Sequence, residues 1–190
     1  MSINFIVLGG TNHENGELED STKDRIIECY KQCSSIKNNN EIIIHFSGGL
    51  RHFNKDNIPH CELCNNFFTK ISKNNYKTEM HIDNNNTVEE AIHFGNYFKG
   101  NNSIIKVITN DWHSERVKYL FNKVFYFYEI KNYEIVDVKS NYKDKDLIKN
   151  EKDKINQLTE KPYGLWKTWM INNYYINKIK LKLVNKNKQD

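Results

Sequence analysis

A dense group of polar side chains follows a short apolar run in the segment VITNDWHSER, residues 107–116. Thr109, Asn110 and Asp111 come directly after the apolar residues, and His113 and Arg116 follow three residues apart. A histidine can transfer a proton near neutral pH, and an arginine can bind a phosphate or carboxylate through two parallel hydrogen bonds. Asp111 could orient His113 or bind a metal ion. The segment therefore has the residue types of a catalytic or anion-binding site.

Small residues follow two other apolar runs, at 3–8 and 41–46. They are Gly9, Gly10 and Thr11 after the first run, and Ser47, Gly48 and Gly49 after the second. Glycine lets the backbone approach a ligand closely, and backbone N–H groups at such turns and at the next helix N-terminus can bind an anion. Neither turn has the GxGxxG pattern or the lysine of a P-loop. Ordinary dinucleotide binding and P-loop NTPase activity are therefore disfavoured.

Short apolar runs alternate with helical patterns along most of the chain. We expect strands at 3–8, 41–46, 76–82 and 103–109, and helices at 21–35, 61–72, 87–98 and 113–122. The runs 124–130 and 133–139 suggest one or two further strands, with a turn at 131–132. This βαβ spacing predicts an α/β fold, a Rossmann-like three-layer sandwich with a mostly parallel sheet.

Finer features of these elements can also be predicted. The strand at 76–82 is shorter and more polar than the others, which favours a place near an edge. Ser21 with Asp24 resembles a capping box, and either Asn86 or Thr87 is expected to cap the helix at 87–98.

The polar clusters should meet at one place, because parallel strands end at the same edge of the sheet and ligands bind there. Arg25 and Glu62, on the first two helices, could reach the same edge. The candidate catalytic residues are His113, Asp111 and Glu62. The candidate ligand-binding residues are Gly9, Gly10, Thr11, Arg25, Ser47, Gly48, Gly49, Thr87, Glu89, Thr109, Asn110 and Arg116. Glu89 and Glu90 could instead favour the helix dipole.

These residues carry a family resemblance. The order of VLGG at 7–10, Arg25, SGG at 47–49, Glu62, TVE at 87–89 and VITNDWHSER at 107–116 resembles the YdcF/SanA/ElyC-like family over residues 3–140. The resemblance implies a Rossmann-like fold with these motifs gathered at one site. Some relatives are membrane-anchored and linked to envelope integrity, and one is associated with S-adenosylmethionine. This chain has Glu90 where the family usually has asparagine, and because no N-terminal membrane helix is expected from its sequence, an envelope role is not expected either.

Two regions are expected, a YdcF-like Rossmann-like domain at 1–142 and a helical C-terminal extension at 143–190. The extension should form helices at 144–160 and 164–183 that pack on the same core. Its aromatic residues would also suit a homo-oligomer contact or another partner surface: Trp166, Trp169, Tyr174 and Tyr175.

Composition limits the other classes of function. The chain has 38% hydrophobic residues and a formal charge of +4 spread along its length, with a denser lysine-rich C-terminal tail, so nucleic-acid binding is disfavoured. The early first strand and the lack of a long apolar run predict a soluble, cytoplasmic protein. The four cysteines are spaced for helix faces rather than for a zinc site: Cys29, Cys33, Cys61 and Cys64. The remaining histidines are interpreted as structural or surface residues: His13, His45, His52, His60, His81 and His93.

The leading hypothesis is a small intracellular enzyme that hydrolyses, or transfers a group from, a phosphorylated or nucleotide-like metabolite. The glycine turns would cradle the anion, Arg25 and Arg116 would neutralise it, and His113 would be the general acid or base. The alternative is a non-catalytic module that binds a nucleotide or S-adenosylmethionine. A divalent metal and S-adenosylmethionine remain open as cofactors, and no residue is assigned as a metal ligand. An interaction protein that uses the aromatic extension is a third hypothesis.

Overall fold

The computed structural model describes residues 1–36, 40–50, 57–140 and 145–173, and five parallel strands form its single sheet. The strands are β1 (Ile3–Val7), β2 (Ile42–Ser47), β3 (Lys77–His81), β4 (Ile104–Asn110) and β5 (Tyr133–Val138). Their order is β3-β2-β1-β4-β5, so the chain reverses its direction of progress between β1 and β4. The fold is the predicted α/β sandwich, and its sheet is entirely parallel within the described residues.

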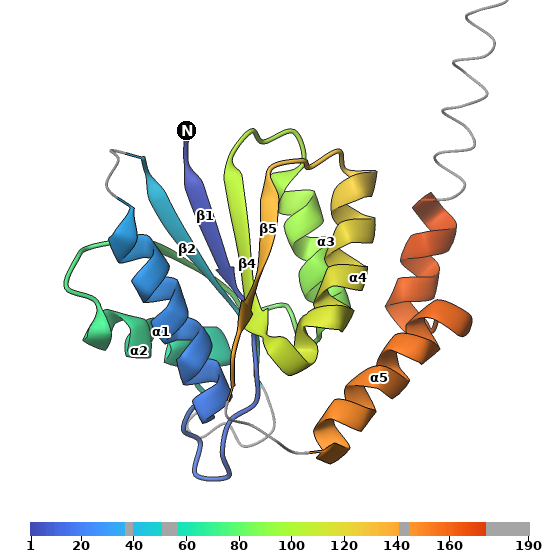
Figure 1. Ribbon diagram of the computed structural model, residues 1–190, viewed down its shortest axis with the longest axis horizontal. Helices are drawn as coiled ribbons and strands as arrows, with labels where there is room; N and C mark the ends of the chain where they lie inside the picture. The colour runs from blue at the N-terminus through green and yellow to red at the C-terminus, as the bar shows by residue number, and fades with distance from the viewer. Residues whose placement is uncertain (37–39, 51–56, 141–144, 174–190) are drawn as a thin grey trace, which may run out of the picture.

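Helices cover both faces of the sheet (Figure 1). Helices α1 (Asp20–Ser35) and α2 (His60–Ile71) pack on one face, and α3 (Thr87–Phe98) and α4 (Asp111–Phe127) pack on the other. Alternate residues of β1 enter the two cores, with Phe5 in the first and Ile6 in the second. Because both faces are covered, every residue of β1 is buried.

Most element predictions are confirmed. The predicted helix 87–98 has the observed bounds of α3, Asn86 caps it by accepting a hydrogen bond from the Glu89 N–H, and β3 is an edge strand. The capping box at Ser21 is wrong, because α1 starts one residue earlier and Glu19 occupies the N-cap without a side-chain bond.

The predicted strand at 124–130 is also wrong. Helix α4 continues to Phe127 and ends where Glu129 adopts a φ of 58°. Its buried residues recur with helical spacing through this stretch: Val117, Leu120, Phe121, Val124 and Phe125. Aromatic and β-branched residues favour a strand locally, but this stripe lets the segment bury one helix face against the sheet and α3.

The C-terminal extension packs beside α4. Helix α5 (Lys145–Glu160) is followed by a helical segment at 164–173, and both lie on the outer side of α4 (Figure 1). Leu158 and Trp166 join the core on the α3–α4 face, and the Trp166 ring stacks on Trp169. Tyr174, Tyr175, His52, the lysine-rich tail and the expected boundary between 142 and 143 lie outside the described residues.

The four cysteines lie buried on α1 and α2, as the helical interpretation of their spacing predicted. In the part of the chain that the structure describes, no helix combines the length and the apolar character needed to cross a membrane.

Candidate functional site

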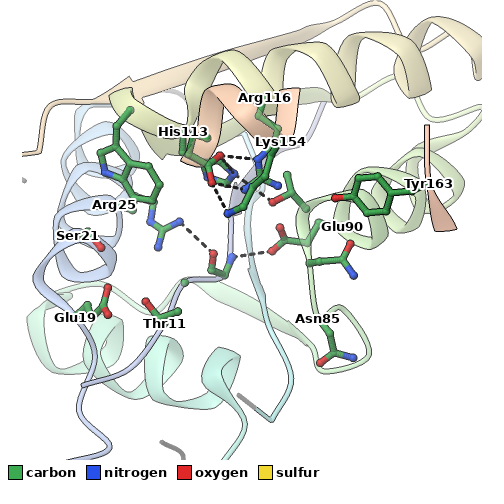
Figure 2. A pocket seen from close by; sticks show the side chains of 16 residues that line it. Thr11, Glu19, Ser21, Arg25, Asn85, Glu90, His113, Arg116, Lys154 and Tyr163 are labelled. Atoms are coloured by element: carbon green, nitrogen blue, oxygen red, sulfur yellow. Dashed lines mark hydrogen bonds and ion pairs between the residues drawn. The ribbon is translucent and has the colours of Figure 1, made fainter. Parts of the chain in front are cut away.

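A pocket of about 340 Å³ lies at the carboxyl edge of the sheet, where the strand order reverses between β1 and β4. This is the place at which open parallel sheets bind ligands. Figure 2 shows charged side chains from α1, α3, α4 and α5 around it. The lining residues are Gly9, Gly10, Thr11, Glu19, Ser21, Arg25, Asn85, Asn86, Thr87, Glu90, Trp112, His113, Arg116, Glu151, Lys154 and Tyr163.

Arg25 is held against the turn that follows β1. Its Nη1 donates to the Gly9 carbonyl at 3.3 Å and its Nη2 donates to the Thr22 hydroxyl at 2.9 Å. A Cβ atom at Gly10 would collide with both Arg25 and Thr22. A side chain at Gly10 would therefore have to displace the Arg25 guanidinium, which occupies the space that it would need.

The backbone N–H groups of the Gly-Gly turn bind side chains of this chain. Gly9 donates to Glu90 Oε1 at 2.8 Å, and Gly10 donates to His60 Nε2 at 2.9 Å. His60 is fully buried, and its Nδ1 lies 2.8 Å from Asn12 Oδ1, so Nδ1 carries the proton in this tautomer. The turn expected to cradle an anion instead uses these two donors to hold α2 and α3.

The SGG turn after β2 has a packing role. Gly48 has a φ of 126°, which favours glycine, and a Cβ atom there would lie 3.0 Å from the His60 ring. A Cβ atom at Gly49 would collide with the Ile82 carbonyl. Gly48 therefore lets the His60 ring of α2 approach closely, and Gly49 lets the segment after β3 approach the turn.

His113 is buried and sits between two hydroxyl groups. Its Nε2 lies 3.2 Å from Thr87 Oγ1, and its Nδ1 lies 3.1 Å from Thr109 Oγ1. Thr87 lines the pocket at the start of α3, and Thr109 belongs to the buried end of β4. A neutral imidazole suits this arrangement, because one ring nitrogen donates and the other accepts.

Burial lowers the pKa of His113 well below its ordinary value of 6.5, and the nearby cations Arg116, Arg25 and Lys154 lower it further. The Glu151 carboxylate lies 3.9 Å from Nε2 and would favour the charged ring. Desolvation and three cations outweigh that one contact, so His113 is neutral near pH 7.

Arg116 is paired with a carboxylate from α5. Its Nε and Nη2 donate to the two oxygens of Glu151, and Lys154 Nζ donates to Glu151 Oε1 at 2.8 Å. The Glu151 side chain is only 5% exposed. The C-terminal extension therefore supplies both a buried counter-ion for Arg116 and a third cation for the pocket.

The structure brings seven of the predicted site residues into the pocket lining: Gly9, Gly10, Thr11, Arg25, Thr87, His113 and Arg116. Thr109 lies behind His113, and Asn110 donates to the Ser21 carbonyl. Thr109 and Asn110 do not line the pocket. The same is true of the six remaining candidates: Ser47, Gly48, Gly49, Glu62, Glu89 and Asp111.

These six have other positions. Ser47 accepts from Asn84 inside the protein, and Glu89 accepts from the Asn85 N–H. Asp111 is exposed and accepts from the Trp112 N–H and the Ser140 hydroxyl. Glu62 is partly buried in the first turn of α2, where its neighbour His60 makes the contact with the β1 turn.

Sequence reasoning did not assign the pocket carboxylates Glu19, Glu90 and Glu151 to the site. A signal for Glu90 existed, since it follows Thr87 and Glu89 in the first turn of α3. Glu151 and Lys154 had no comparable signal, because they are two charges among many on a polar helix.

Comparison of the chain with protein-family models, with curated proteins and with solved structures gave no match. The class that the fold and site define is therefore an α/β protein with a charged pocket at the switch point of a parallel sheet.

Proposed function

We propose that this protein is an enzyme that acts on a phosphorylated or nucleotide-like small molecule in the pocket between β1 and β4. The observation that supports it is that three cations, Arg25, Arg116 and Lys154, face the same cavity as the Thr87–His113 pair. Cations bind the phosphate, and a neutral histidine accepts a proton from an attacking hydroxyl group. Hydrolysis and group transfer would both use these parts.

The charge of the pocket fits a ligand that displaces an internal ion pair. Three carboxylates, Glu19, Glu90 and Glu151, balance the three cations. A phosphate competes with Glu151 for Arg116, since both offer oxygens to the same guanidinium edge. Binding would then free Glu151 to approach His113 and to stabilise a positive charge on its ring.

The geometry favours His113 as a base rather than as an acid. The ring is neutral near pH 7, and Nε2 contacts the pocket-lining Thr87 hydroxyl. In the tautomer that carries the proton on Nδ1, the His113 Nδ1–H donates a hydrogen bond to the Thr109 hydroxyl oxygen. His113 Nε2 then has a lone pair with which it can accept a proton. Thr87 would then relay or position the nucleophile.

The resemblance to the YdcF/SanA/ElyC-like family adds support, since six residues that its motifs specify line this pocket: Gly9, Gly10, Arg25, Thr87, His113 and Arg116. That resemblance brings S-adenosylmethionine into the set of ligands to test. A divalent metal is the other cofactor to test, because the pocket contains three carboxylates.

The test is a thermal-shift screen against inorganic phosphate, sugar phosphates, nucleotides and S-adenosylmethionine, with and without Mg²⁺. Ligands that bind are then assayed for product. A ligand at about 100 times its dissociation constant adds about 2.7 kcal/mol to the free energy of unfolding. We expect Arg116→Ala to abolish the shift. The control Lys118→Ala, which changes a cation on the same helix that pairs with Asp137 outside the pocket, should retain it.

His113→Asn separates catalysis from binding. We expect this variant to bind the ligand and to lose turnover, because asparagine retains hydrogen-bonding groups but cannot accept the proton. A screen in which no phosphate-bearing compound binds, or an Arg116→Ala variant that binds as well as the wild type, would contradict the proposal.

The second candidate is a binding module for a nucleotide or S-adenosylmethionine without catalysis. The observation that favours it is that both nitrogens of His113 already contact threonine hydroxyls. Ligand binding without product, with or without Mg²⁺, and with equal affinity in His113→Asn, would support this candidate.

A further inference from the structure

Three histidines and a glutamate form a second polar cluster at the β2–β3 edge of the sheet. His45 lies on β2, Glu79 and His81 lie on β3, and His93 lies on α3. His45 and Glu79 are register partners, and His81 is two residues further along the same face. Phe94, Phe98 and Tyr97 of α3 surround the fully buried His45 ring.

The histidines form a continuous chain of short contacts. His45 Nδ1 lies 3.0 Å from His81 Nε2, and His81 Nδ1 lies 2.9 Å from His93 Nε2. At the inner end, His45 Nε2 lies 3.0 Å from Asn4 Oδ1. The amide oxygen can only accept, so His45 Nε2 carries its proton and His45 Nδ1 presents a lone pair towards His81.

We propose that His45, Glu79 and His81 form a binding site for a first-row transition-metal ion such as Zn²⁺. Each residue directs one ligand atom to a common space, and these atoms all lie within 4.8 Å of one another. Two imidazoles and one carboxylate are a ligand set that zinc uses when a fourth position is left for water.

Two of the three distances between ligand atoms are close to those of such a site. Zinc–nitrogen bonds of about 2.0–2.1 Å in a tetrahedron put ligand atoms about 3.3 Å apart. His45 Nδ1 lies 3.0 Å from His81 Nε2 and 3.6 Å from Glu79 Oε2. Small side-chain movements would therefore admit the ion. Glu79 can make the largest of them, because its side chain is 28% exposed whereas His45 is held in the core.

Partners beyond the three ligands are also in place. Asn4 accepts from the far side of His45, His93 contacts the far side of His81, and the Tyr97 hydroxyl donates to Glu79 Oε2 at 2.6 Å. Metal-binding histidines usually donate their second N–H to such partners, which fix the ring orientation. Lys77 lies 3.6 Å from Glu79 Oε1, on the other carboxylate oxygen.

Metal binding requires a rearrangement of protons along the histidine chain. Without an ion, His81 Nε2 must donate to His45 Nδ1, and His93 Nε2 can donate to His81 Nδ1. With the ion, His81 Nε2 presents its lone pair to the metal and its proton moves to Nδ1. His93 Nε2 then accepts, with the His93 proton on Nδ1. No proton is lost in this exchange, so two neutral histidines still bind the ion.

The site is separate from the pocket, since none of its three ligands lines that cavity. It would join the edge strand β3 to the buried strand β2. Its occupancy should therefore raise the thermal midpoint of the whole sheet, independently of any phosphate ligand.

The test is titration of chelator-treated full-length protein with ZnCl₂ by isothermal calorimetry and thermal shift. We expect one ion per chain, a rise in thermal midpoint, and the visible absorption of four-coordinate cobalt when Co²⁺ replaces Zn²⁺. His81→Asn should weaken binding by about 100-fold or more, and Glu79→Gln by about 10-fold or more. The matched control is His13→Asn, an exposed histidine outside the cluster, which should bind as the wild type does.

Several outcomes would overturn the proposal. Wild-type protein that binds no zinc would do so, as would binding that survives unchanged in both His81→Asn and Glu79→Gln. Sulfur-to-cobalt charge-transfer bands would put the ion on the cysteines instead. Glu79→Gln keeps the shape of a partly exposed side chain, so it remains informative if His81→Asn fails to fold.

Discussion

Replacing Glu151 with glutamine should have opposite effects on stability and on anion binding. The carboxylate is 5% exposed and accepts hydrogen bonds from Arg116 and Lys154. A hydrogen bond to a charged group contributes about 1.5–3 kcal/mol. Glutamine keeps the shape and one acceptor oxygen, so we expect Glu151→Gln to lower the free energy of unfolding by about 1.5–3 kcal/mol.

The same change should strengthen binding of inorganic phosphate. A phosphate that takes the guanidinium edge of Arg116 displaces the Glu151 carboxylate, which then lies about 6–8 Å from the phosphate charge. At an effective dielectric constant of about 20, that repulsion is about 2–3 kcal/mol per unit charge. Solvent at the pocket mouth screens part of it, so a gain of about tenfold in affinity, about 1.4 kcal/mol, is the expected minimum.

The assay combines urea unfolding with phosphate titration at low and at physiological salt. The matched control is Glu134→Gln, which removes a 62% exposed carboxylate paired with Lys106. The control should change stability by less than about 1 kcal/mol and should leave phosphate binding unchanged. If Glu151→Gln is as stable as the wild type, or binds phosphate no more tightly, the role assigned to the Arg116–Glu151 pair is wrong.

Three further predictions concern packing, the turn and pH. Trp166→Ala should lower the free energy of unfolding by about 3–5 kcal/mol in urea, because the ring is 1% exposed in the α3–α4 core; a loss below 1 kcal/mol would mean that the extension is not docked. Gly10→Ala should displace Arg25 and weaken phosphate binding in calorimetry, and unchanged binding would remove Arg25 from the site. The lowered pKa of His113 makes the folded chain take up fewer protons than the unfolded chain below pH 6.5. The neutral ring therefore makes its full contribution to the free energy of unfolding above pH 6.5, and that contribution is lost as the pH falls. Between pH 7 and pH 5 the wild type should therefore lose more stability than His113→Asn, by at most about 2 kcal/mol, and equal losses would show that the ring takes up a proton as readily in the fold as in the unfolded chain.

The parts of the fold that sequence predicts are those with local causes. Strands β1, β2 and β4 are short apolar runs that both faces of the sheet bury, and α3 begins at a capping asparagine. The stretch 124–130 failed because its aromatic content favours a strand, whereas its contacts with α3 and the sheet select a helix. Only the packing of residues 124–127 against α3 and the sheet decides between a strand and a helix for this segment.

For the site too, the sequence predicts the residues with a local cause and misses those that depend on tertiary contacts. Residues directly after a strand, such as Gly10 and His113, could be placed because the end of each parallel strand fixes their position. Glu90 and Glu151 reach the site through contacts with Gly9 and Arg116 that span 81 and 35 residues of the chain. No local pattern encodes such pairs. For the same reason, the histidine contacts across β2, β3 and α3 became visible only when the strands were in register.

The position of α5 also has a consequence for synthesis on the ribosome. All five strands have been translated by Val138, so the sheet can assemble before the extension emerges. The pocket needs residues as late as Lys154 and Tyr163. During that interval Arg116 lacks the Glu151 carboxylate, whereas Glu19 and Glu90 are already part of the chain that lines the cleft. The order of the elements thus makes the emergence of α5 the event that pairs Arg116 with its buried counter-ion.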